Sequence, residues 1–257
     1  MLVVGLVLPP AAAQADSANS AGAVLTVGVH YVAPPFVGGA KVRTPEQIET
    51  LLAGELAREL NRQPKYVELD AATVSLAPGS VDFAVVDLGG NTPRLADGSA
   101  TIIATGQVTR SMAIMRTDTD IKSWRQLKGR TVCVSEDGRY AGRIADQYGA
   151  IERLYRAPAD SLLALRTGEC DAAVHDDTML KALLRFPEWK KFSASLTMRE
   201  TQTQYFVVPA ANQALAETLK EVVARWDRQG YLEKLIAEMT RDIAFEVYLD
   251  QTVPDCH

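Results

Sequence analysis

A histidine and two aspartates, His175, Asp176 and Asp177, stand side by side directly after a short apolar run. Such a group can ligate a metal, transfer a proton or offer negative charge to a cationic ligand. A metal site needs ligands that converge from elsewhere, and the chain has only His30 and His257 as further histidines. We therefore predict no metal and no other cofactor.

The sequence contains charged candidates for a binding site but no familiar reaction signature. It has no GxSxG, no HExxH and no GxxxxGK[ST] motif, which mark hydrolases, metalloproteases and nucleotide-binding proteins. We therefore predict a binding protein and not an enzyme.

The three cysteines are Cys133, Cys170 and Cys256. In an exported chain, one disulfide and one spare thiol is the simplest arrangement. We predict the pair Cys133–Cys170, because each cysteine adjoins a predicted strand of the same segment. The alternative is that both are buried free thiols.

The N-terminal stretch "MLVVGLVLPPAAAQADS" is a short apolar run followed by Ala13-Gln14-Ala15, which is typical of a secretory cleavage site, although a basic n-region is missing. We predict a signal peptide over 1–15, cleaved near Ala15, and an exported protein. The alternative is a buried N-terminal helix, which Pro9-Pro10 disfavours. With 257 residues, 47% of them hydrophobic, and a net charge of -5, the chain offers no cationic surface for nucleic acid or anionic membranes.

The hydrophobic pattern predicts two α/β units. In the first, the strand "VLTVGV" precedes a loop over 30–45, a helix that opens at Pro45 and Glu46, and the strands "PKYVELD" and "VDFAVVDLGG". In the second, a short helix "SWRQLKG" precedes the strand "RTVCVS", a helix "GRYAGRIADQYG", and a helix over 156–167 that leads through Gly168 into a strand. The strand "TQYFVVP" and a long helix follow, and "QGYLEKLIAEM" continues that helix after Gly230.

Open parallel sheets bind ligands at the carboxyl ends of their strands. Four segments lie at such ends: the Tyr31 to Gly39 loop, the Asp87 to Arg94 turn, the Ser135 to Tyr140 turn, and His175 to Asp177. We therefore expect the binding site to form where these segments meet.

The phrases "LTVGVHYVAPPF", "DIKSWRQLKGRTVCV", "GECDAAVHDD" and "QALAETLKEVVARWDRQGYLEKL" resemble the family 3 periplasmic solute-binding proteins, which deliver polar amino acids to ABC importers. The resemblance covers about residues 24 to 240. It implies an α/β two-lobe periplasmic binding protein-like fold of type II, which the chain crosses twice, near "RSMAIMR" and "TQYFVVP". The lobes would then comprise 24–111 (lobe 1), 112–204 (lobe 2) and 205–257 (return to lobe 1 and C-terminal tail).

The resemblance also implies roles for the acidic group. In the family, an aspartate five residues after the "DA" aspartate binds the ligand ammonium, and counting from Asp171 gives Asp176. A partly desolvated carboxylate at a strand end suits this role. We expect Asp177 to cap the following helix and His175 to point to the opposite face of its strand.

The carboxylate-binding side of the family site matches less completely. The segment "GGNTPR" keeps Thr92 and an arginine, Arg94, but Gly90 stands where the family has serine. The family's "FSxPY" reads "IIATG" here, and its "GTT" helix start reads "GRY". Together with Thr92 and Arg94, the resemblance makes Tyr31, Phe36, Arg139 and Tyr140 the candidate ligand-binding residues.

Arg139 allows two readings. At a helix start inside the cleft, it would join Arg94 in favouring an acidic amino acid or a dicarboxylate. The alternative is that its side chain turns outward into solvent.

The resemblance implies a monomeric periplasmic protein whose partners are a small-molecule ligand, an amino acid or related carboxylate, and the permease of an ABC importer. One alternative is an enzyme on the same fold, similar to the periplasmic cyclohexadienyl dehydratases, with Glu136 or Asp137 as general acid. Another is a ligand-sensing partner of a membrane receptor.

Overall fold

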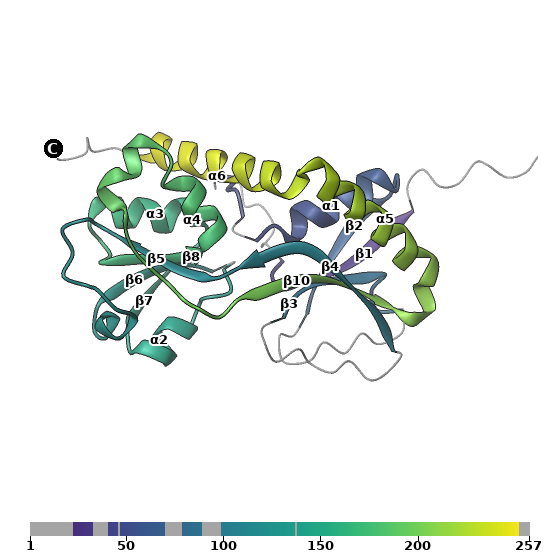
Figure 1. Ribbon diagram of the computed structural model, residues 1–257, viewed down its shortest axis with the longest axis horizontal. Coiled ribbons are helices and arrows are strands. Elements are labelled where there is room, and N and C mark those ends of the chain that lie inside the picture. Colours follow the sequence, from purple (N-terminus) through teal and green to yellow (C-terminus); the bar gives the residue numbers. More distant parts are fainter. Residues whose placement is uncertain are drawn as a thin grey trace, which may run out of the picture.

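The computed structural model describes residues 23–32, 41–45, 47–69, 79–88, 99–136 and 138–251. These residues form two lobes, each built around a five-stranded sheet of parallel and antiparallel strands (Figure 1). The predicted signal peptide, Phe36, Thr92, Arg94, Asp137 and Cys256 lie outside the described residues. No helix in the described part of the chain is long and apolar enough to span a membrane.

Lobe 1 holds the first sheet. Its strands lie in the order β2 (Gln63–Glu68), β1 (Val24–Val29), β3 (Phe83–Leu88), β10 (Gln202–Pro209) and β4 (Ala100–Thr109). β1 pairs in parallel with β2 and β3, whereas β10 runs antiparallel to β3 and β4. Helix α1 (Glu49–Glu59) begins later than the predicted opening at Pro45 and Glu46. It buries Leu52 and Leu56 and contacts all three parallel strands.

Lobe 2 holds the second sheet, in the order β7 (Ile151–Tyr155), β6 (Thr131–Ser135), β8 (Ala172–Asp176), β5 (Ser111–Met115) and β9 (Ala194–Thr197). Its helices are α2 (Arg143–Tyr148), α3 (Pro158–Thr167) and α4 (Asp177–Leu183), with 3-10 turns at Trp124–Leu127 and Pro187–Phe192. The Cys133–Cys170 disulfide is present, with 5.9 Å between the two Cα atoms, which confirms the predicted pairing.

The chain passes between the lobes twice, first from β4 to β5 through Arg110 and later from β9 to β10. Before and after these passages, β4 and β10 pair with each other in lobe 1. β4 and β10 therefore lie side by side in lobe 1, where the chain leaves and re-enters it (Figure 1).

Two helices follow β10 and a 3-10 turn at Ala210–Asn212: α5 (Gln213–Gln229) and α6 (Tyr231–Asp250). Gly230, with a left-handed φ of 58°, separates them, so the predicted continuation is a second helix. α5 packs on β4 and β10 of lobe 1, whereas α6 contacts α5 and then α3 and α4 of lobe 2. α6 thus runs along both lobes (Figure 1), and one hydrophobic cluster joins the lobe 1 core to α6, α3 and α4.

Two further predicted helices differ in the structure. The segment "SWRQLKG" forms one 3-10 turn, and α2 begins at Arg143 and not near Gly138. Gly142 has a left-handed φ of 79°, so the residues before it form turns instead of the first helical turn. This shift leaves Arg139 and Tyr140 in a turn that faces the other lobe.

Candidate functional site

A cavity of about 650 Å³ lies where the two lobes face each other. Lobe 1 lines it with residues at the carboxyl ends of β1, β2 and β3, and lobe 2 with residues that follow β6. The charged and titratable residues among this lining are His30, Glu68, Asp87, Glu136, Arg139 and Arg143. The predicted candidate Tyr31 also lines the cavity. The position agrees with the rule that open sheets bind ligands at strand ends.

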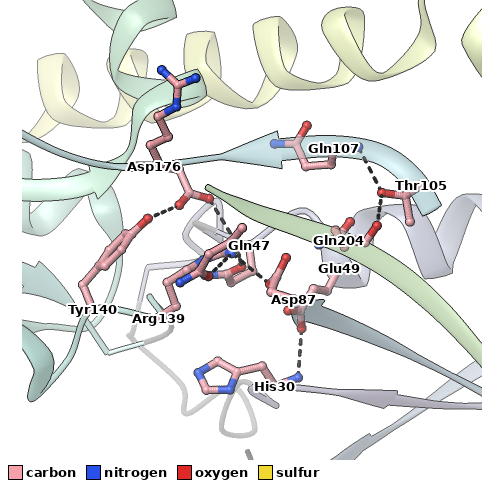
Figure 2. Close-up of polar contacts among 12 residues, drawn as sticks. His30, Gln47, Glu49, Asp87, Thr105, Gln107, Arg139, Tyr140, Asp176 and Gln204 are labelled. Carbon is pink, nitrogen blue, oxygen red and sulfur yellow. Dashed lines mark hydrogen bonds and ion pairs between the residues drawn. The ribbon is translucent and has the colours of Figure 1, made fainter. Parts of the chain in front are cut away.

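Arg139 links the two lobes across this cleft (Figure 2). Its Nη1 lies 3.1 Å from Asp87 Oδ2 at the end of β3 and donates to Gln202 Oε1 at 2.9 Å. Its Nη2 donates to Gln47 Oε1 at 2.8 Å and to Asp176 Oδ2 at 3.2 Å. The side chain is only 7% exposed, so it does not turn outward into solvent. The second predicted orientation of Arg139 is therefore wrong.

The charge of Arg139 is already balanced within the chain. Burial by itself lowers the pKa of the guanidinium, but the charges of Asp176 and Asp87 outweigh burial and raise the pKa above its ordinary value. Arg139 is therefore not a spare cation waiting for an acidic ligand, and the main reason for expecting such a ligand is lost.

Asp176 lies at the end of β8, where the sequence placed it, and is 6% exposed. Its Oδ2 contacts Arg139, and its Oδ1 accepts a hydrogen bond from the hydroxyl of Tyr140. Neither Asp176 nor Tyr140 is among the lining of the large cavity, because Arg139 stands between them and the cleft (Figure 2). The predicted ammonium anchor thus binds a guanidinium of its own chain.

Glu49, the first residue of α1, is a buried carboxyl that sequence reasoning missed. Its Oε2 accepts the backbone N–H of His30 at 2.9 Å, and its carboxyl also shares a hydrogen bond with the side chain of Asp87. Burial, followed by repulsion from Asp87, raises the pKa of Glu49 to about 8, against the opposing charge of Arg139. Glu49 therefore holds a proton at neutral pH. An acidic residue in a first helical turn is usually a solvated partner of the helix dipole, so the sequence gives no sign of this burial.

The pKa of His30 is lowered, chiefly by partial burial and then by the charge of Arg139. His30 is therefore uncharged at neutral pH. Among the described lining residues, three carboxyl groups, those of Glu68, Asp87 and Glu136, face two arginines, Arg139 and Arg143. Since Arg139 also pairs with Asp176, the remaining charge of the cleft is negative.

His175 lies in the core of lobe 2 and not in the cleft, with no exposed surface. Its Nε2 is 2.7 Å from Ser161 Oγ and its Nδ1 is 3.4 Å from Ser135 Oγ. Because Ser161 donates its proton to the carbonyl of Pro158, His175 Nε2 donates to Ser161. The described residues contain no group of three or more histidine, cysteine or acidic side chains that could hold a metal.

Asp177 does not cap α4 with its side chain, and that prediction is wrong. Asp177 is itself the first residue of α4, and its Oδ1 accepts the backbone N–H of Arg110 at 2.8 Å. Its Oδ2 pairs with Lys181 at 2.6 Å. Asp177 therefore fixes the first crossover between the lobes.

A second cavity of about 360 Å³ borders the cleft on the lobe 2 side. Tyr140, Tyr148 and Glu200 line it, and it shares Arg143 and Gln202 with the large cavity. Glu136, the candidate general acid, lines the large cavity.

No protein-family model and no curated protein sequence matches this chain. Its structure is similar to that of the substrate binding protein of an amino acid ABC transporter, with 21% identity, a TM-score of 0.51 and coverage of 84% of this chain and 98% of the other. An ancestral cationic amino acid solute binding protein matches at 17% identity and a TM-score of 0.56, over 84% of this chain and 95% of the other.

The GluR0 ligand binding core in complex with L-glutamate matches at 18% identity and a TM-score of 0.50, over 85% of this chain and 96% of the other. At such identities the similarity concerns the fold and not the ligand. The similarity agrees with the resemblance found in the sequence and with the two observed lobes. The chain therefore has the α/β two-lobe fold shared by these substrate-binding proteins.

Proposed function

We propose that this protein binds a small polar solute in the cleft between its lobes and delivers it to an ABC importer. The single observation that carries this proposal is the cavity of about 650 Å³, which charged side chains from both lobes line at their strand ends. A site divided between two lobes buries a solute when the lobes close on it, and buried charged groups then bind strongly. The predicted signal peptide supports a periplasmic location for this function.

An amino acid or a related carboxylate is the proposed class of solute. The structural neighbours include proteins described as binding an amino acid, a cationic amino acid and L-glutamate, so the fold accepts solutes of different charge. The negative remaining charge of the described cleft favours a solute with a positive group near Glu68 and Glu136.

A thermal-shift screen of the purified protein tests the proposal. The panel comprises acidic, neutral and basic amino acids and small mono- and dicarboxylates. A solute at about 100 times its Kd should raise the unfolding midpoint by about 5 to 10 °C. Glu68→Gln should weaken the binding of that solute. Glu188→Gln, a change at an exposed residue of lobe 2, should leave its binding unchanged. A panel without any hit, measured on folded protein, would contradict the proposed solute classes.

The position of Glu136 in the cleft supports a second candidate function, a dehydratase of cyclohexadienyl substrates. In a cyclohexadienyl acid, a cleft carboxyl can protonate the ring hydroxyl, which leaves as water while the ring carboxylate leaves as CO2 and its bonding electrons complete an aromatic ring. Incubation with a cyclohexadienyl acid should then produce aromatic ultraviolet absorbance, and Glu136→Gln should abolish it. If a solute binds but no product forms, the dehydratase function is rejected and transport and sensing remain as candidate functions. Capture of a permease by the solute-loaded protein would then support transport, and capture of a receptor would support sensing.

A further inference from the structure

The guanidinium of Arg139 occupies the place in the cleft where charged and polar groups converge. It contacts Asp176 and stands beside Tyr140 in lobe 2, reaches Asp87 and Gln47 in lobe 1, and donates to Gln202 at the second crossover. The four residues that its guanidinium contacts come from four separate parts of the chain. Arg139 itself lies in a turn between β6 and α2, so neither element requires an arginine at this position.

The partners of Arg139 are chemically those of a bound cation. Two carboxylates supply the charge, and two amide oxygens accept one further hydrogen bond each from Nη1 and Nη2. Their oxygens would suit an ammonium equally well, since each is a hydrogen-bond acceptor. Because Arg139 already binds them, an ammonium from solution must displace a guanidinium that is attached to the chain and has no translational freedom to lose.

If an ammonium displaced the guanidinium of Arg139 from Asp176 and Asp87, the charge of Arg139 would also lose the carboxylates that balance it. Its side chain is 7% exposed, and an unpaired buried guanidinium is strongly unfavourable. Glu49, whose charge also acts on Arg139, holds a proton and offers no replacement charge.

We propose that Arg139 is an internal occupant of a cation subsite formed by Asp176, Asp87, Gln47 and Gln202, and that it determines specificity by excluding a solute ammonium from Asp176. The inference rests on the proposed function for the role of the cleft. A solute of this protein is then held by the outer cleft groups, among them Glu68, Glu136 and Arg143. Its recognition does not depend on an α-ammonium at Asp176.

Chemical rescue tests the proposal without any natural solute. Arg139→Ala removes the atoms that ethylguanidinium contains, so ethylguanidinium chloride is the probe. It should raise the unfolding midpoint of Arg139→Ala by about 3 to 5 °C at about ten times its Kd, relative to equal sodium chloride. Wild type should show no such shift. Arg116→Ala, which removes an exposed arginine paired only locally with Asp118, controls for the loss of a surface guanidinium.

The double variant Arg139→Ala/Asp176→Asn should lose the rescue, because it lacks the carboxylate that receives the probe. A folded Arg139→Ala protein that gains nothing from ethylguanidinium overturns the proposal. So does a shift of equal size in wild type, which would place the probe outside the subsite.

A measurement on the wild-type protein covers the case in which Arg139→Ala does not fold. With arginine labelled by ¹³C and ¹⁵N, the guanidinium of Arg139 should give slowly exchanging signals. These signals should persist when L-alanine, L-arginine or L-glutamate is added at millimolar concentration. Loss of that protection on addition of an amino acid would show that the ammonium displaces Arg139, which contradicts the proposal. Such a result would still support solute binding, so the two proposals can fail separately.

Discussion

At the scale of single residues, three carboxyl groups that look equivalent in the sequence have three different surroundings. Asp176 is held by Arg139 and Tyr140, Asp177 by the backbone of Arg110, and Glu49 keeps its proton because it is buried beside Asp87. A carboxyl group takes its role from its partners and its burial, which are properties of the folded chain.

The raised pKa of Glu49 predicts how the stability of the protein depends on pH. In the folded state Glu49 titrates near pH 8, and in the unfolded chain near 4.5, so folding takes up a proton between these values. The stabilisation that this group contributes is fully present below about pH 4.5 and is lost as the pH rises toward 8, at about 1.4 kcal/mol per pH unit.

We therefore expect Glu49→Gln to flatten the fall in the free energy of unfolding between pH 5 and 8. Urea unfolding at several pH values measures this slope. Glu238→Gln, a change at an exposed residue of α6, is the matched control. An unchanged slope in Glu49→Gln would mean that Glu49 is ionised in the folded protein.

We expect substitution of Asp177 to change the stability of the protein and not its affinity for a solute. Asp177→Ala should lower the free energy of unfolding by about 1 to 3 kcal/mol, because the N–H of Arg110 loses its side-chain acceptor at the crossover. Asp177→Asn keeps an acceptor oxygen and should cost less. Urea unfolding measures both, and equal stability of all three proteins would contradict this role.

At the scale of elements, the disulfide ties β6 to Cys170, two positions before β8. Cys133 and Cys170 are separated by 37 positions, and in the chain-entropy model a loop of this length is worth about 4 kcal/mol. We expect the double variant Cys133→Ala/Cys170→Ala to unfold at a lower temperature than wild type, with a folded circular dichroism spectrum retained at low temperature.

Cys256→Ala is the control for that experiment, because it leaves the disulfide in place. A reducing agent should lower the unfolding midpoint of wild type and of Cys256→Ala alike. The reducing agent should have no effect on the double variant. If it lowers the unfolding midpoint of the double variant as well, the fall in wild type is not caused by reduction of this disulfide.

The cleft is also a product of the elements around it. β1, β2, β3 and β6 end at the same cavity, so residues at or just after their ends meet there although they are far apart in the chain. Gly142 has a left-handed backbone conformation, so α2 begins only at Arg143. Arg139 therefore lies in a turn, from which its side chain reaches Asp87 in the opposite lobe.

At the scale of the whole molecule, α6 connects the lobes. It follows α5 in lobe 1 and packs on α3 and α4 in lobe 2, with Met239, Ile243 and Val247 buried. Arg43, from the segment before α1, adds polar contacts with Asp160 of α3 and with Asp250 of α6. We infer that the lobes lose their structure together and not one after the other.

Ile243→Ala tests this coupling. Removing a fully buried side chain should lower the free energy of unfolding by about 2 to 5 kcal/mol. Calorimetry should still show one transition, shifted to lower temperature. Arg241→Ala, on the exposed side of the same helix, controls for altered helix propensity. Two separate transitions in wild type would contradict coupled unfolding.

The sequence by itself determined the two α/β lobes, the places of most strands, the disulfide and the strand ends at which a cleft forms. These features depend on local periodicity, on glycine and proline, and on the chemistry of strand ends, all of which can be read along the chain. Tertiary structure alone decided the partners of Arg139, which lie 37 to 92 positions away, the burial and protonation of Glu49, and the enclosure of His175 in the core. The physical reason is that charge pairing and desolvation depend on distances between residues that only the folded chain brings together.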